Sequence, residues 1–360
     1  MKLLKSAICI AMALGFVQAS NVAHSANFKG KTIRIVINFA AGGPTDIFAR
    51  HYQTYLSKFV PGNPTVIVEN RPGAAGIVAA NFLYNRATPD GLTIGTFAGI
   101  AANKVIAKGK VKYDLTKFNW LGAVPQTQIL VARNNLGVSK PTDLLKSKEP
   151  LVYGTSGINP NFVNTRLFLE LMGVKFKAVF GYRGQARAIQ ALRRDEINIT
   201  DLGISGYLPR EASYKQEGVV IPVLQRGIMD SQQRFTRVAA LSQIPTMEEA
   251  LRETNPAGLK SAKFKAIKAV LGAYHVQFGF VVPPKTPKAV IAALRKAYAD
   301  MFGSAAVKKE SKARFKVDHQ FVDGPSAQRF VTNLVAGVAP DVKAAIRAAT
   351  KRKGKGKRKK

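Results

Sequence analysis

Cysteine is nearly absent from this chain, since Cys9 is the one cysteine in 360 residues. It lies within the first 26 residues, which have the composition of a segment that is removed from the mature protein. The rest of the sequence therefore offers no disulfide and no cysteine nucleophile. With 46% hydrophobic residues, a chain of this length is long enough to bury a sizeable core without disulfide bonds.

Long apolar runs are also absent, because no run approaches the roughly 20 consecutive apolar residues that span a bilayer. The apolar stretch Ala7–Val17 is too short for this, and it follows Lys2 and Lys5 in the pattern of a secretory signal peptide. We expect residues 1–26 to be a cleaved signal, with cleavage after Ala19 or after Ala26. The mature protein is then expected in the periplasm.

Acidic residues are scarce: 21 Asp and Glu stand against 55 Lys and Arg, for a net charge of +34. The last ten residues carry eight of these positive charges and no acid, so residues 350–360 are expected to form a disordered basic tail. This charge favours anionic partners and leaves open an exported protein that binds polyanions or a cell surface. Because no aromatic residues interleave the tail, we expect no specific nucleic-acid partner.

Catalytic signatures are missing as well. The chain has neither H-E-x-x-H nor G-x-S-x-G, and its four histidines do not have metal-ligand spacing. It also lacks the glycine pattern of a dinucleotide site and the G-K-[ST] of a P-loop. We therefore expect no enzymatic activity, no bound metal and no cofactor.

The most informative stretch that is present begins at Thr32. Thr32–Phe39 is an apolar, β-branched run typical of a strand buried on both faces, and Pro44–Phe59 has a helical spacing of apolar residues. The glycines between them can expose backbone N–H groups beside the positive end of the helix dipole, which favours an anion such as a carboxylate. A simple turn is the alternative. The residues of this junction are the first candidate ligand-binding group: Ala41, Gly42, Gly43, Pro44, Thr45 and Asp46.

The same pattern returns more than a hundred residues later. Leu151–Tyr153 is a short predicted strand, and a junction of small and hydroxyl-bearing residues leads into another helix. Two such units indicate two lobes that enclose one anion beyond the carboxyl ends of their strands. The candidate residues of this second junction are Thr155, Ser156, Gly157 and Asn159. Their hydroxyl and amide groups could equally serve only as helix caps.

Two further candidates have equally plausible structural roles. Tyr182 follows the predicted strand 177–180, and it could either reach the ligand or pack in the core. Asp201 ends the predicted strand 198–202, and it could either face the ligand or serve the fold.

Strands alternate with helices along the rest of the chain, which predicts an α/β fold with open parallel sheets. Residues 121–132 form one extended run, and residues 276–282 form a strand that could return the chain to the first lobe. We therefore expect lobe 1 to comprise residues 27–125 and 276–349, and lobe 2 to comprise residues 126–275. The hinge would lie at the two crossings.

Several motifs, in order over residues 32–300, resemble those of the periplasmic receptors of tripartite tricarboxylate transporters, the Bug proteins. They are Gly42-Gly43-Pro44-Thr45-Asp46 with Ala49-Arg50, the block Glu69-Asn70-Arg71-Pro72-Gly73-Ala74-Ala75-Gly76, Pro89-Asp90-Gly91, Tyr113-Asp114, Pro245-Thr246 with Glu248, and Pro283 with Thr286-Pro287. The second junction departs from the family's Ser-x-Gly-x-Gly-Ser, because Asn159 replaces a glycine and Pro160 replaces a hydroxyl donor.

The resemblance implies a type II periplasmic-binding-protein fold, with two α/β sheets, a hinge and an interlobe cleft. It further implies a monomer that captures a small carboxylate, such as a di- or tricarboxylate, an aromatic acid or an amino acid, and delivers it to membrane permease subunits. The two junctions would hold the ligand carboxylate through N–H and hydroxyl groups. An orphan ligand sensor without transport remains an alternative.

Overall fold

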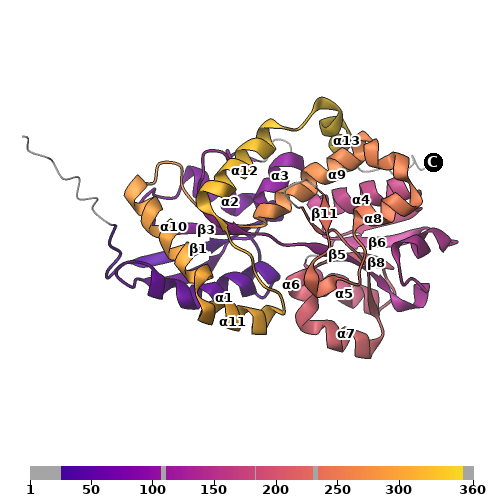
Figure 1. The fold of residues 1–360 in the computed structure, drawn as a ribbon, viewed down its shortest axis with the longest axis horizontal. Coiled ribbons are helices and arrows are strands. Elements are labelled where there is room, and N and C mark those ends of the chain that lie inside the picture. The colour runs from indigo at the N-terminus through magenta and orange to yellow at the C-terminus, as the bar shows by residue number, and fades with distance from the viewer. Residues whose placement is uncertain (1–25, 107–110, 183, 230–233, 352–360) are drawn as a thin grey trace, which may run out of the picture.

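The computed structural model describes residues 26–106, 111–182, 184–229 and 234–351. The expected signal peptide, apart from its last residue, and the basic tail from residue 352 onward lie outside the described residues, as does Arg183. Two mixed β-sheets, each covered by helices on both faces, lie side by side along the long axis of the molecule (Figure 1). This confirms the two-lobed α/β fold that the sequence predicts.

The first lobe is built on a six-stranded sheet in the order β13-β4-β12-β3-β1-β2. Its strands are β1 (Thr32–Ile37), β2 (Thr65–Asn70), β3 (Thr93–Ala98), β4 (Asn119–Val124), β12 (Phe278–Val282) and β13 (Val322–Asp323). Side chains of β1 alternate between two cores, since Ile33, Ile35 and Ile37 pack on one face and Val36 packs on the other. One face is covered by α1 (Pro44–Phe59), α10 (Lys288–Gly303) and α11 (Ala305–Phe315), and the other by α2 (Ile77–Asn85), α3 (Ile100–Ile106) and α12 (Gly324–Ala336).

The second lobe is built on a five-stranded sheet in the order β7-β6-β8-β5-β9. Its strands are β5 (Gln128–Arg133), β6 (Leu151–Thr155), β7 (Phe176–Phe180), β8 (Ile199–Gly203) and β9 (Val220–Gln225), and a small hairpin, β10 (Ile228–Met229) with β11 (Phe235–Thr236), follows them. One face carries α5 (Gln185–Arg193), α6 (Ile204–Tyr207) and α7 (Glu211–Glu217), and the other carries α4 (Pro160–Met172), α8 (Met247–Thr254) and α9 (Ala262–Gly272). Short 3₁₀ turns include η1 (Ala74–Gly76), η3 (Pro141–Lys146), η4 (Leu208–Arg210), η6 (Pro256–Lys260) and η7 (Ala273–Val276).

The predicted extended run 121–132 is in fact two strands in different sheets. Residues 125–127 separate β4 of the first lobe from β5 of the second. After η7, the chain returns as β12, which lies antiparallel between β3 and β4. The expectation of parallel sheets was wrong for this reason: β5 and β12 enter each sheet from the other lobe, and they run against their neighbours.

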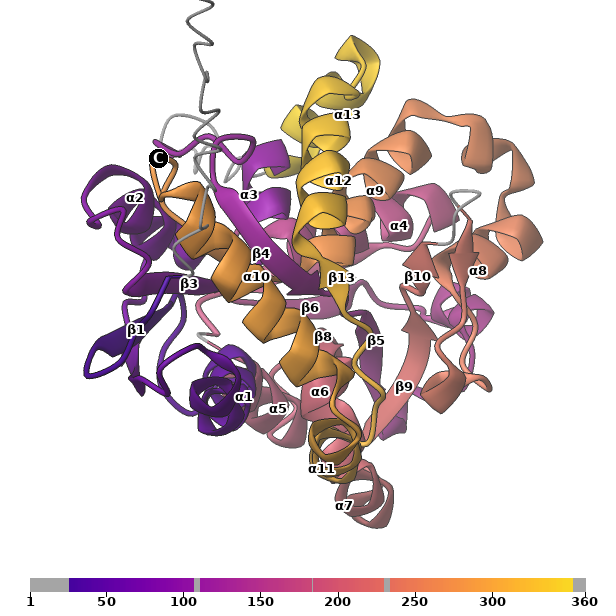
Figure 2. The ribbon, with the colours of Figure 1, turned by 60° about the vertical axis from the view of Figure 1, so that its left-hand side comes forward.

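The last two helices lie along one side of the molecule (Figure 2). α12 packs on β4, whereas α13 (Pro340–Thr350) packs on α9 and α4 of the second lobe. One continuous apolar core includes Val331 of α12, Ile346 of α13 and Leu167 of α4. The two lobes therefore share a buried layer on this side. Within the described ranges, no helix combines the length and apolarity needed to cross a membrane.

Candidate functional site

The loop between β1 and α1 is held together by the side chain of Asp46. Its Oδ2 accepts a hydrogen bond from the N–H of Gly42 (2.9 Å), and its Oδ1 accepts from Arg50 Nε and Asn70 Nδ2 (both 2.9 Å). Gly42 has a φ of +76°, although a Cβ there would meet nothing within 4 Å, so glycine is needed for its backbone conformation rather than for space. Asp46 therefore braces the loop, and the Gly42 N–H is already occupied.

The start of α1 leaves two backbone donors for a ligand. Gly43, at the N-cap, has no side chain to cap the helix, and Pro44 at the first helical position has no N–H. The N–H groups of Thr45 and Asp46 have no hydrogen-bond acceptor among the described residues, because the first intrahelical bond runs from Ile47 N to Gly43 O (2.9 Å). Both lie at the positive end of a 16-residue helix.

The six candidates of this junction differ in exposure. Ala41 and Gly42 are exposed, Gly43 and Pro44 are half-buried, and Thr45 and Asp46 are buried.

The second junction is arranged differently, because α4 is capped by its own side chain. Asn159 Oδ1 accepts from the N–H of Phe162 (2.9 Å), and its Nδ2 donates to Ser156 Oγ (2.9 Å). The Ser156 hydroxyl is exposed and keeps its own proton for donation, and a Cβ on Gly157 would meet only open space. The Thr155 hydroxyl donates to the Gly157 carbonyl (3.4 Å). This junction therefore offers hydroxyl groups more than bare amides.

Tyr182 is tied to the second junction through its backbone, because its N–H donates to the Thr155 carbonyl (3.3 Å), whereas its side chain packs elsewhere. Its ring packs against the core beneath α5, and its hydroxyl donates to Glu196 (3.3 Å) at the turn that precedes β8. Burial and the nearby Glu196 carboxylate raise the pKa of Tyr182.

Asp201 belongs to a buried network under the start of α4. Its carboxylate pairs with the guanidinium of Arg226, whose side chain is 1% exposed, and it accepts from the hydroxyls of Thr165 (3.0 Å) and Tyr153. Arg226 also donates to Asn161 Oδ1 (2.8 Å) in the first turn of α4. Burial acts to lower the pKa of Arg226, but the Asp201 carboxylate together with Tyr274 and Tyr153 raises that pKa above its usual value. The named partners of Asp201, which are Tyr153, Thr165 and Arg226, are themselves buried.

The carboxyl edges of the two sheets meet near the link between them. Ala98 and Val124, the last residues of β3 and β4, pair with the same residue at the start of β12. In the second sheet, Gln128 at the start of β5 pairs with Gly203 at the end of β8. The four Cα–Cα steps from Val124 to Gln128 span at most about 14 Å. Ligands of open α/β sheets bind beyond such edges.

The α1 start already touches the second lobe at this edge. The position that a Cβ on Gly206 of α6 would take lies 3.9 Å from Pro44 Cγ and 2.6 Å from Gln185 Oε1. Gln126, in the link, accepts from the hydroxyl of Ser205 (2.6 Å). No local pattern singles out these glutamines, because the contacts that bring them together join distant segments of the chain.

A left-handed turn at residues 74–76 packs against Asn38, which lies between β1 and the first junction. Ala74 (φ +46°) and Ala75 (φ +54°) both adopt this conformation, which costs roughly 1–2 kcal/mol per residue for a side chain with a Cβ. Asn103 Nδ2 donates to the Ala75 carbonyl (2.7 Å) and holds the turn. At Gly76, a Cβ would lie 2.2 Å from Asn38 Nδ2, and Asn38 in turn ties β1 to Ala98 through two hydrogen bonds.

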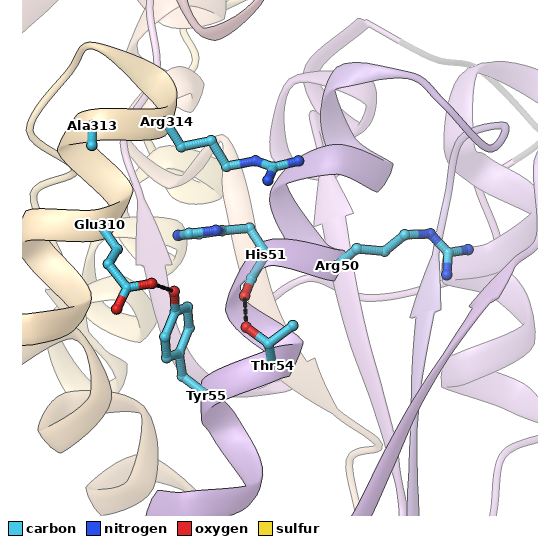
Figure 3. A pocket seen from close by; sticks show the side chains of 7 residues that line it. All are labelled: Arg50, His51, Thr54, Tyr55, Glu310, Ala313 and Arg314. Atoms are coloured by element: carbon cyan, nitrogen blue, oxygen red, sulfur yellow. Dashed lines mark hydrogen bonds between the residues drawn. The ribbon is translucent and has the colours of Figure 1, made fainter.

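A separate surface hollow of about 570 Å³ lies between α1 and α11 (Figure 3). Tyr55 donates to Glu310 at one end, and Arg314 lies over His51 (Figure 3). His51 Nε2 is 2.8 Å from Ser311 Oγ, and burial together with Arg314 lowers the pKa of His51. Tyr55 bonds to Glu310 and His51 to Ser311 across two packed helices, so the hollow is part of the interface between α1 and α11.

Neither of the two junctions, both of which lie within the described residues, contains a group of residues placed to hold a metal ion. Across the part of the chain that the structure describes, no group of three or more His, Cys, Asp or Glu residues is placed to hold a metal ion.

Solved structures define the class of this fold. The chain superimposes on the periplasmic binding protein BugD with a TM-score of 0.66 at 22% identity, covering 88% of this chain and 97% of BugD. It superimposes on MatC from Rhodopseudomonas palustris with bound malate with a TM-score of 0.62 at 21% identity, covering 89% and 99% of the two chains. The fold is that of a periplasmic binding protein.

The family follows from the sequence. The profile described as the tripartite tricarboxylate transporter family receptor matches residues 48–344. A relative from Cupriavidus necator, the "UPF0065 protein in gbd 5'region", is 28% identical over 268 residues, which is 70% of this chain and 75% of the relative. The chain belongs to the tripartite tricarboxylate transporter receptor family and is a solute-binding receptor of that family, as the motif resemblance predicts.

Proposed function

We propose that this receptor is exported to the periplasm, binds a small carboxylate between its two lobes and delivers it to permease subunits of a tripartite tricarboxylate transporter. It acts without catalysis. The observation that carries this proposal is the uncapped start of α1, which lies at the carboxyl edge of the first sheet and touches the second lobe at Gly206.

The ligand carboxylate accepts hydrogen bonds from the N–H groups of Thr45 and Asp46. The Asp46 brace keeps these donors in place before the ligand arrives, so little ordering is needed on binding. The helix dipole adds roughly 0.3–2 kcal/mol to the binding of an anion at this position. That MatC was solved with malate is in keeping with a carboxylate ligand in this fold.

The second lobe contributes hydroxyl groups and closes on the ligand. Ser156 donates its free proton, while Asn159 fixes the Ser156 oxygen and the start of α4 together. We assign Thr155, Gly157 and the four residues from Ala41 to Pro44 to the same ligand shell, and we assign Tyr182 and Asp201 to its support.

The lobes comprise residues 27–125 with 276–349 and residues 126–275, and they rotate about two links. Residues 125–127 form one link, and η7 leading into β12 forms the other. α13 is a third connection, because it lies within the first-lobe range 276–349 in sequence but packs on α4 and α9 of the second lobe.

A ligand screen tests the proposal. Purified mature protein is heated with citrate, malate, succinate, aromatic acids or amino acids, and a ligand at about 100 times its dissociation constant should stabilise the protein by about 2.7 kcal/mol. Affinity for the best ligand should fall in Ser156→Ala and stay unchanged in Ser213→Ala, a matched exposed serine on α7. If no carboxylate raises the melting temperature, the proposal is wrong. Transport assays with and without the permease then separate a transport receptor from an orphan sensor.

A further inference from the structure

Two glutamine side chains near the interlobe link have amide oxygens without a partner. Gln128 is 7% exposed, and its Oε1 has no hydrogen-bond donor among the described residues. The Oε1 of Gln277 is likewise buried and without a partner in the described part of the chain. Buried side-chain polar atoms nearly always have a partner, so these two oxygens call for an explanation.

Gln128 lies near Gln185, which in turn lies beside the start of α1. The position of a Cβ on Gly203 would lie 3.4 Å from Gln128 Nε2 and 3.1 Å from Gln185 Nε2. Gln185 also approaches Gly206, the residue that meets Pro44.

The other two glutamines lie at the two links between the lobes, Gln126 between β4 and β5 and Gln277 between η7 and β12. The backbone N–H groups of Gln126 and Gln277 donate to the same acceptor, the carbonyl of Tyr274 (3.2 Å each). We call Gln126, Gln128, Gln185 and Gln277 the glutamine cluster.

Two arginines near this region already pair with acids, and a third, Arg210, donates to the Gly206 carbonyl (3.1 Å). Arg226 donates its backbone N–H to Gln128 O (2.9 Å), but its guanidinium is bound to Asp201. Arg50 is bound to Asp46 (2.9 Å) and to Asn70 (3.0 Å). A second ligand carboxylate would therefore meet neutral amides here, and neither Arg226 nor Arg50 is free to receive it.

We infer that the ligand carries one carboxylate, bound at the α1 start, and a neutral hydrogen-bonding group at its other end, a hydroxyl or a carboxamide, bound by the glutamine cluster. This inference rests on the proposed function and narrows its ligand class. An amide presents both a donor and an acceptor, and a hydroxyl or carboxamide can satisfy both. A carboxylate can only accept, and it would bring an unpaired charge into a buried place. An alkyl end would leave the glutamine oxygens unsatisfied, and a site built to hydrogen-bond a polar group binds an analogue without that group far more weakly.

The test is calorimetric titration with acids of matched length. Glutarate, glutaramate, 5-hydroxypentanoate and pentanoate are compared, together with the corresponding series one carbon shorter and one carbon longer. At the length that fits best, we expect the hydroxy or amide acid to bind at least about tenfold tighter than the diacid and than the alkyl acid.

Variants assign this preference to the cluster. Gln128→Leu should weaken binding of the hydroxy or amide acid by about tenfold or more and leave the alkyl acid unchanged or tighter. Gln277→Leu provides a second, independent variant in case Gln128→Leu does not fold, which circular dichroism and melting will show. Gln216→Leu, at an exposed position on α7, is the matched control and should change nothing.

The outcomes are distinguishable. If the diacid binds tighter than its hydroxy and amide partners at every length, or if both leucine variants weaken all acids equally, the inference is wrong and the proposed function stands. If no acid of any series or of the ligand screen binds, both are wrong.

Discussion

The buried pair between Asp201 and Arg226 can be tested by Asp201→Asn, a change that removes the charge and keeps the shape. The Asp201 side chain is 4% exposed and the Arg226 side chain 1%, so the guanidinium left behind would have little access to water. The hydroxyls of Thr165 and Tyr153 could still donate to the asparagine oxygen, but the new amide N–H₂ would face donors.

The expected loss in the free energy of unfolding is about 3 kcal/mol. Removing one partner of a buried ion pair typically costs about 3–5 kcal/mol, because an uncompensated charge remains. The lower end applies here because asparagine keeps one acceptor for the neighbouring hydroxyls. Since whole domains are stable by only about 5–15 kcal/mol, the loss should be easy to see in the midpoint of urea unfolding.

A double-mutant cycle separates the ion pair from general disruption. Arg226→Met is made alone and with Asp201→Asn, and the double variant should lose clearly less than the sum of the single variants. If Asp201 serves the fold, affinity for the best carboxylate in folded Asp201→Asn should change by less than about threefold, well under the tenfold that 1.4 kcal/mol represents. A single variant that loses under about 1 kcal/mol, or one that keeps its stability and loses its ligand, would refute the structural role.

Three further predictions concern other parts of the chain. Gly42→Ala should lower the free energy of unfolding by about 1–2 kcal/mol, because the residue at this position has a φ of +76°. Gly303 has neither a positive φ nor a close neighbour, so Gly303→Ala should be neutral in the same urea titration. Burial and the neighbouring His51 lower the pKa of His319 to about 3, so as the pH falls the unfolded chain takes up a proton at this residue before the folded chain does. The free energy of unfolding should therefore fall by up to about 1.4 kcal/mol per pH unit from about pH 6.5 towards pH 3. His319→Gln should flatten this slope, and an unchanged slope would contradict the prediction. Removing residues 352–360 should weaken salt-sensitive retention on heparin and leave the carboxylate affinity unchanged, whereas loss of carboxylate binding would favour the polyanion alternative.

Local sequence patterns predict those helices and strands whose start, end and apolar spacing are visible in the sequence itself. Pro44 and the apolar spacing behind it predict the helix at Pro44–Phe59, as the structure has it. The alanine-rich residues 74–86 would fit a single helix by composition, but α2 begins only at Ile77, because Ala74 and Ala75 are left-handed and alanine gives no sign of this. The run 121–132 is interrupted at Pro125-Gln126-Thr127-Gln128, which is where the chain passes between the sheets, although the three polar residues among these are buried like their apolar neighbours.

The chemistry of the site was less accessible than its position. The sequence locates both junctions, but it does not show which backbone N–H groups are taken by the junctions' own side chains: Asp46 accepts from the Gly42 N–H, and Asn159 accepts from the Phe162 N–H. The role of Asp201 depends on Arg226, which is 25 residues away in the chain. The glutamine cluster draws on residues from Gln126 to Gln277, and its members meet only through the crossing of the lobes.

The high positive charge and the neutral donors of the site should act on different rate constants. A chain with a net charge of +34 attracts anions at long range, and this attraction is screened within about 8 Å at physiological salt. The contacts assigned to the bound ligand are backbone N–H groups, hydroxyls and amides at close range, which salt screens far less. Raising the salt from about 0.02 to about 0.5 M, a change that shortens the screening length several-fold, should therefore slow association in stopped-flow experiments and leave dissociation nearly unchanged. If dissociation accelerates in step with salt instead, a charged side chain must hold the ligand, and the neutral site described here is wrong.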